Sequence, residues 1–261
     1  MGRMDYRHLL ISENVTTNFT ANNLHGFDLI MPEIIDLLLQ LQYFCKVYKK
    51  AKGSTSFFNS YCFHQYLQIP YSLRAAFILC KSGYYFEATF IIRYLMEILA
   101  KMKYLRKHKN YINNIWLNDP IFLQTKKGKR KLTLRDIFEE VSPGAYRNYG
   151  ILLSNFQHGG TGTMLFRTER NQNKISAIKM GSVWDDFTSS FVVNNIIMLS
   201  YSIINNFPTF FQRGFKKADG EILFQYEEVM KSLKSFLKAH KKEHPKSRKW
   251  YRELAGLLKK N

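Results

Sequence analysis

Two segments of this chain carry reactive side chains at helical spacing. In the first, Arg93 and Glu97 stand four residues apart along a stripe that is otherwise aromatic. In the second, Arg147, Ser154 and His158 share one face of a predicted helix, which two glycines end directly after the histidine. If the two faces meet, they form a cationic pocket that contains an imidazole.

Such a pocket could cleave RNA without a metal, because the 2′-hydroxyl of RNA is an internal nucleophile. His158 would act as general acid or base, and Arg93 and Arg147 would bind the phosphate. Glu97 would orient these groups, and Ser154 would add a hydrogen bond. Two structural alternatives stay open. His158 could cap the end of its helix, and Arg93 with Glu97 could be an internal ion pair that fixes helix packing.

Net charge is the clearest feature of the composition. The chain has 261 residues, with 39 Lys or Arg against 20 Asp or Glu, for a formal charge of +19. Between Lys101 and Arg135 we count eleven basic residues against one acidic residue, and from Gln212 onward fourteen against six. Clustered like charge favours a polyanionic partner, most commonly nucleic acid and next an anionic membrane surface. A lysine bias that serves solubility is the alternative.

Two basic segments are the candidate nucleic-acid-binding residues. Their cations could follow a phosphate backbone, and a tryptophan in the second could stack on a base. The alternative is a solvated helix face and an exposed loop. The candidates are Lys126, Lys127, Lys129, Arg130 and Lys131 in the first segment, and Lys241, Lys242, Arg248, Lys249 and Trp250 in the second.

No metal or cofactor is expected. The three cysteines form no Cys-x-x-Cys pair. The run from His240 to His244 has the His-x-x-Glu-His order of one metalloprotease class, but lysines surround it and Pro245 follows at once. No phosphate-binding glycine motif has the required strand before it and helix after it. No apolar run is long enough to cross a membrane and the first residues lack a signal-peptide core, so we expect a cytoplasmic protein.

Helical periodicity dominates the chain and predicts a mainly α fold. We expect a helical bundle over residues 1–210, with a small β-hairpin insertion at about 163–181, and a basic helical C-terminal extension over 211–261. Residues 1–26 are expected to form a mixed lead-in, and Lys126 to Lys131 an exposed loop. Thr133 is expected to cap a short helix. The predicted helices span 32–50, 70–82, 84–108, 143–158, 184–207, 219–240 and 247–260.

A family resemblance can be placed on these residues. The helix motif Arg93-x-x-x-Glu97, preceded by Arg74, Gly83 and Glu87-Ala88, and the later Ser154-x-x-x-His158-Gly element resemble the HEPN superfamily over about residues 70–205. The resemblance implies a helical bundle that often dimerises, and in many members a metal-independent ribonuclease of toxin or phage-defence systems. It would give His158 the catalytic histidine role. Residues 152–157 hold no arginine, so Arg93 or Arg147 would have to join the histidine in space.

The leading hypothesis is that the protein acts on RNA. Its more specific form is that the protein is a metal-independent endoribonuclease that needs no cofactor. The alternative is a non-catalytic module that binds nucleic acid or a protein partner, in which the same residues only hold the core. The family resemblance implies that the protein could form a homodimer. Peripheral membrane association through the C-terminal lysines ranks third.

Overall fold

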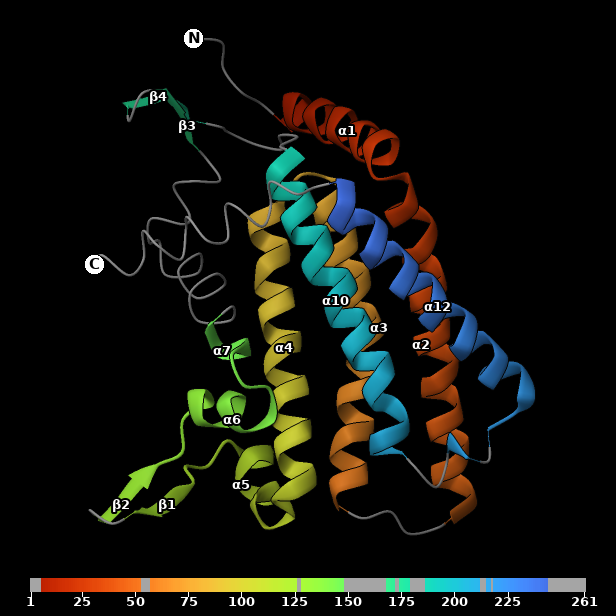
Figure 1. Ribbon diagram of the computed structural model, residues 1–261, viewed down its shortest axis with the longest axis vertical. Helices are drawn as coiled ribbons and strands as arrows, with labels where there is room; N and C mark the ends of the chain where they lie inside the picture. Colours follow the sequence, from red (N-terminus) through yellow and green to blue (C-terminus); the bar gives the residue numbers. More distant parts are fainter. Residues whose placement is uncertain are drawn as a thin grey trace.

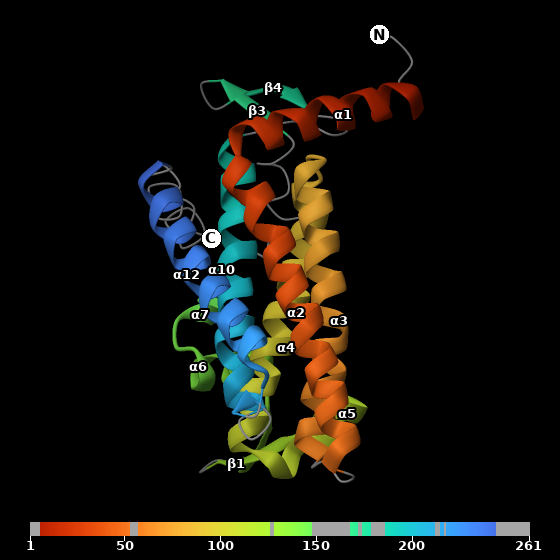
Figure 2. The same cartoon turned by 90° about the vertical axis from the view of Figure 1, so that its right-hand side faces the viewer.

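The fold is a bundle of long helices. The computed structural model describes residues 6–52, 57–125, 128–147, 168–171, 174–178, 186–211, 215–216 and 218–243. Within them, five long helices run side by side, and α1 (Tyr6–Asn23) lies across one end of the bundle (Figures 1 and 2). The five are α2 (His25–Lys52), α3 (Phe57–Lys81), α4 (Tyr85–Lys107), α10 (Asp186–Phe210) and α12 (Gly220–Glu243). The predicted mainly α bundle is confirmed.

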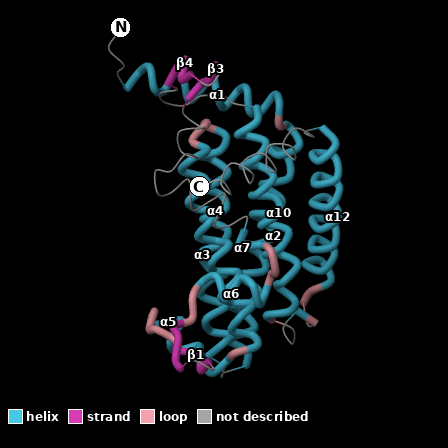
Figure 3. The backbone as a smooth tube through the Cα atoms, turned by 60° about the vertical axis from the view of Figure 1, so that its left-hand side comes forward, coloured by secondary structure: helices cyan, strands magenta, loops and turns pink. Residues whose placement is uncertain are grey.

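Short elements follow α4, beginning at the end of the bundle opposite α1 (Figure 3). After α4 the chain forms a 3-10 turn and a short helix, then a hairpin and two further short helices. These are η1 (Lys109–Tyr111), α5 (Ile112–Leu117), β1 (Phe122–Thr125), β2 (Gly128–Lys131), α6 (Leu134–Val141) and α7 (Ala145–Arg147). A second hairpin, β3 (Thr168–Asn171) with β4 (Lys174–Ile178), is antiparallel and confirms the predicted insertion.

Apolar residues at helical spacing build the main core. On α2, the buried residues Ile30, Ile34, Leu37 and Leu41 recur every three or four positions, so they line one face. The apolar faces of α3, α4 and α10 pack against these residues in one core. Burial of apolar side chains therefore stabilises each helix on the side that faces its neighbours. α12 packs against α2 and α10 and adds Val229, Met230 and Leu233 to the same core. The basic helical segment after residue 211 is thus anchored in the bundle through α12.

A second, smaller core lies between α4 and α6. Ala100 and Tyr104 of α4 pack against Ile137 and Phe138 of α6, and all four are buried. The prediction that Thr133 begins this short helix is confirmed, because its side chain accepts a hydrogen bond from the backbone N–H of Asp136. This small core attaches α6, and the hairpin that precedes it, to the outer side of α4.

Several predicted boundaries were wrong. Residues 6–26 form no mixed lead-in: α1 spans Tyr6–Asn23, and Gly26 lies inside α2. Pro32 and Pro70 were read as helix starts and Pro208 as a stop, but all three lie within helices. A proline inside a helix removes one backbone hydrogen bond and crowds the preceding turn. Apolar residues before and after each proline are buried in the core. The free energy gained by their burial outweighs the cost of the lost hydrogen bond.

α1 is fastened to the turn between α3 and α4. The Thr20 hydroxyl donates to the carbonyl of Lys81 at 3.0 Å, and the Tyr84 hydroxyl donates to the Glu13 carboxylate. None of the described helices combines the length and the apolar content that a membrane crossing needs.

Candidate nucleic-acid interface

Arg93 and Glu97 form an ion pair on α4. The Nε of Arg93 donates to Oε1 of Glu97 at 3.2 Å, and the side chains are 18% and 25% exposed. The spacing of four residues places both on the same side of the helix. Their partial burial strengthens the attraction relative to a surface pair, because less water screens it. The two residues are therefore held together in the way that either a structural or a phosphate-binding role requires.

The other predicted catalytic residues are described in part or not at all. His158 and Ser154 lie outside the described residues. Arg147 is the last residue of α7, and its side chain also lies outside them. The meeting of an imidazole with the Arg93 guanidinium stays a prediction.

We expect the Arg93–Glu97 pair to contribute a coupling free energy of about 1–2 kcal/mol to folding, more than an exposed helical pair does. A double-mutant cycle with Arg93→Met and Glu97→Gln, followed by urea unfolding, measures it. The matched control is the exposed pair Glu228 and Lys231 on α12, which lies at 3.7 Å. Equal coupling in the two cycles would show that burial adds nothing to the α4 pair.

Residues 128–131 of the first basic segment form a hairpin strand, so the prediction of an exposed loop was wrong for these residues. β2 pairs antiparallel with β1, with Phe122 opposite Lys131 and Leu123 opposite Arg130. Gly128 starts the strand with φ of 114°, a backbone conformation that favours glycine. Lys129, Arg130 and Lys131 are exposed, as expected, while Lys126 and Lys127 lie outside the described residues. A run of like charges has no apolar alternation, so its strand character depends on the partner strand.

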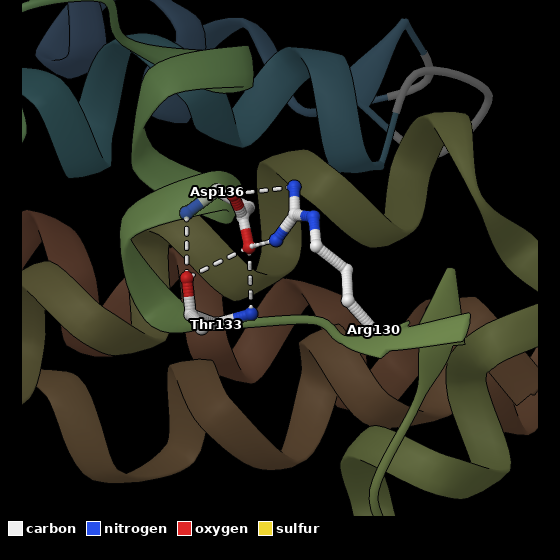
Figure 4. Close-up of polar contacts among 3 residues, drawn as sticks. All are labelled: Arg130, Thr133 and Asp136. Atoms are coloured by element: carbon white, nitrogen blue, oxygen red, sulfur yellow. Dashed lines mark hydrogen bonds and ion pairs between the residues drawn. The ribbon is translucent and has the colours of Figure 1, made fainter. Parts of the chain in front are cut away.

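A polar network locks the corner between β2 and α6 (Figure 4). Arg130 donates to both carboxylate oxygens of Asp136, at 2.6 and 3.0 Å. The backbone N–H and the hydroxyl of Thr133 donate to Asp136 Oδ2 at 2.9 and 2.7 Å. Arg130 and the two bonds from Thr133 hold the pKa of Asp136 well below its usual range. The Arg130 guanidinium therefore positions this corner, and a phosphate would have to share it with Asp136.

This network makes a prediction about pH. Because the folded pKa of Asp136 is depressed, its stabilising effect is present above the ordinary pKa of 3.8 and is lost as the pH falls toward the lower folded value. Between about pH 5 and pH 2, the wild type should therefore lose more unfolding free energy than Asp136→Asn does. Urea unfolding of both proteins at the two pH values measures the difference. Parallel losses would mean that the carboxylate stabilises nothing.

Cations cluster around this corner. The second half of α4, the following turn and the hairpin carry Lys101, Lys103, Arg106, Lys107, Lys109, Lys129, Arg130 and Lys131, and α6 adds Arg135. We call this set the basic end. Burial lowers the pKa of Lys103. Two acids of α6 are engaged inside the cluster: Asp136 pairs with Arg130, and Glu140 lies 3.8 Å from Lys107. Nine of the eleven basic residues between Lys101 and Arg135 are described by the structure, and they lie in this one region.

A polar pocket of about 330 Å³ opens within the basic end. It lies between α4, α5, the end of β2 and the start of α6, and Glu97 is part of its lining. This pocket could not be predicted from the sequence, since its walls come from three separate segments and no motif indicates that they meet. The residues that line it are Glu97, Lys101, Asn114, Ile115, Asn118, Asp119, Pro120, Ile121, Lys131, Leu132, Thr133, Leu134 and Ile137.

His108, which the sequence motifs did not indicate, also lies in this region. The ring of His108 stacks on Tyr104, with centroids 4.3 Å apart and planes at 26°. Its Nε2 lies 2.7 Å from Oε1 of Glu140 on α6. Burial, together with the charge of Glu140, raises the pKa of Tyr104 to about 12. The imidazole therefore links the end of α4 to α6 through Glu140, and the ring of neutral Tyr104 stacks against it.

The C-terminal candidates are only partly described. Lys241 and Lys242 lie in the last turn of α12, and their side chains are outside the described residues, as are Arg248, Lys249 and Trp250. Within the described ranges, no group of three or more His, Cys, Asp or Glu side chains is placed to hold a metal ion. No family model, no curated protein and no solved structure matches this chain.

Proposed function

We propose that this protein binds nucleic acid through the basic end, with RNA as the favoured partner. The observation that carries the proposal is the gathering of nearly all basic residues of segment 101–135 around one corner of the bundle, beside a polar pocket. Lys129 and Lys131 are exposed, and so are Arg106, Lys107 and Lys109 on the adjoining end of α4 and its turn. The resemblance of residues 70–205 to HEPN proteins favours RNA over DNA.

Phosphate binding at such a surface has a recognisable physical signature. Each lysine or arginine that neutralises a phosphate releases a condensed counterion, so affinity falls as the salt concentration rises. The local concentration of charge also steers a polyanion toward this end of the molecule during association. Both effects depend on where the cations lie and not on the total charge alone.

The test is a titration of a labelled single-stranded RNA with the purified protein at several salt concentrations between about 50 and 200 mM. We expect a steep linear decrease of the logarithm of affinity with the logarithm of salt concentration. A DNA strand of the same sequence is the control for sugar preference. Binding that does not depend on salt would contradict the proposal for both nucleic acids, and equal binding of RNA and DNA would remove the preference for RNA.

Metal-independent RNA cleavage is the second candidate. Its supporting observation is that Glu97, paired with Arg93, reaches from α4 into the lining of the pocket at the basic end. A phosphate bound there would lie close to a carboxylate that can act as a general base, and the guanidinium paired with it can stabilise negative charge. Incubation of RNA with wild type and with His158→Ala in excess chelator tests it. Intact RNA in both reactions would leave a non-catalytic binding module.

A further inference from the structure

The pocket at the basic end has walls that are fixed before any ligand arrives. One wall is the end of α5, where Asn118 adopts a left-handed conformation with φ of 59° and the N–H of Asp119 donates to the carbonyl of Asn114 at 2.7 Å. The facing wall is tied to it, because the N–H of Leu132 donates to the carbonyl of Ile121 at 2.7 Å. Preformed walls lower the ordering cost of binding.

The facing wall, at the turn from β2 into α6, is also fixed by hydrogen bonds and by packing on α4. The network of Arg130, Thr133 and Asp136 fixes the turn from β2 into α6, and Thr133 itself lines the pocket. Ile137, the next residue of α6, packs its buried side chain into the small core with α4. The pocket is therefore built on a capped helix and a packed core, and not on a free loop.

The chemistry of the lining is mixed in a particular way. Lys101 and Lys131 supply positive charge, Asn114 and Asn118 supply amides, and Asp119 supplies a solvent-exposed carboxylate. Glu97 is already engaged by Arg93. The largely buried side chains of Ile121 and Ile137 make part of the lining apolar, and we call this part the floor of the pocket.

A ligand that matches this lining needs an anionic group for the lysines, N–H donors for the carboxylate, and a flat apolar face for the floor. A nucleotide has all three, as phosphate, base edge and base face. A bare phosphate would leave the carboxylate and the amides unused, and a divalent cation would be repelled by two lysines. The volume of about 330 Å³ lies within the range of small-molecule pockets, roughly 300–1,000 Å³.

We propose that this pocket takes a single nucleotide unit of a bound RNA strand and prefers a base with an exocyclic amino group. This inference rests on the proposed function, since the strand reaches the pocket along the basic end. Lys101 and Lys131 bind the phosphate, and the Asp119 carboxylate accepts hydrogen bonds from the amino group of the base. Uracil has no amino group; its ring N–H can donate to the carboxylate, but the two carbonyl oxygens beside that N–H are repelled by the negative charge, so uracil binds more weakly.

Calorimetry with the four nucleoside 5′-monophosphates tests the pocket apart from the strand. We expect AMP, GMP and CMP to bind more tightly than UMP by about tenfold, as expected for one charge-assisted hydrogen bond. Asp119→Asn should reduce this difference to about twofold or less, because the amide can donate to a uracil carbonyl. Inorganic phosphate and the uncharged nucleosides are the comparison ligands, and each should bind more weakly than the monophosphates.

Two neighbouring asparagines of α5 provide a matched control. Asn114 lines the pocket, whereas Asn113 is exposed and lies outside the lining. Asn114→Ala should weaken nucleotide binding about tenfold and Asn113→Ala should not change it. Thermal unfolding of both variants checks that the fold is retained.

The outcomes separate this inference from the proposed function. If RNA binds with a steep salt dependence but the monophosphates do not bind, or bind no better than inorganic phosphate, the nucleotide pocket is wrong and the RNA interface stands. If the monophosphates bind with the expected preference but RNA does not bind, the pocket serves a free nucleotide and the RNA interface is wrong. Equal effects of the two asparagine variants would also overturn the pocket.

Discussion

Tyr66→Ala is expected to destabilise the protein by about 3–5 kcal/mol, the range for removing a large aromatic side chain from a packed core. Tyr66 is 1% exposed and lies where α3 meets α10. Its ring makes edge contacts with Phe207 and Phe211, with centroids 5.2 and 5.5 Å apart. Its hydroxyl donates to the carbonyl of Ile203 at 2.7 Å. The substitution therefore leaves a cavity and removes both interactions.

Tyr66→Phe separates the two contributions, because it keeps the ring and removes only the hydroxyl. We expect a loss of about 1 kcal/mol, the net value of one buried neutral hydrogen bond. Tyr43→Ala on α2 is the control, since Tyr43 is 68% exposed and its loss should change stability by less than about 0.5 kcal/mol. Urea unfolding with constant m-values gives all three free energies. Equal effects of Tyr66→Ala and Tyr43→Ala would contradict the packing of α3 on α10.

The largest expected effect on function comes from the triple substitution of Arg106, Lys109 and Lys129 by Gln. All three are exposed cations of the basic end. Each phosphate contact contributes about 0.7 to the salt slope for single strands, so the slope should fall by about 2. At about 0.1 M salt this corresponds to roughly a hundredfold loss of RNA affinity. Anisotropy titrations across salt concentrations measure both quantities.

The control is a second triple variant with the same change in net charge. Lys231, Lys234 and Lys238 are exposed on α12, which lies across the bundle from the hairpin (Figure 1). Their replacement by Gln should reduce RNA affinity severalfold at most, through the long-range field alone. If both triple variants lose affinity equally, binding depends on total charge, and the basic end is not the interface.

Local signals in the sequence were sufficient for part of this structure. The predicted helix 84–108 agrees with α4 because its apolar residues keep helical spacing throughout. The start of α6 was found because Thr133 is of a residue type that commonly caps helices, and in the structure it forms a capping box with Asp136. The spacing of Arg93 and Glu97 likewise determined their pairing. These features depend on contacts between residues that are close in the chain.

Features that depend on distant contacts were missed. The strand β2 has the sequence Gly-Lys-Arg-Lys, and only its pairing with β1 makes it a strand. Pro32 and Pro70 carry a local signal for a helix start, which burial along α2 and α3 overrides. The pocket brings together residues between Glu97 and Ile137 from separate elements, and no spacing in the sequence encodes that meeting.

The small core of Ala100, Tyr104, Ile137 and Phe138 has a consequence for the energetics of the binding region. These four buried residues form a cluster apart from the main core, so α6 is held to α4 by a core much smaller than the one that joins the long helices. Opening of this unit costs less free energy than global unfolding, because the five long helices keep their contacts. We therefore expect the amides of this corner to exchange faster than those of the five long helices, and a bound ligand to slow exchange at this corner first.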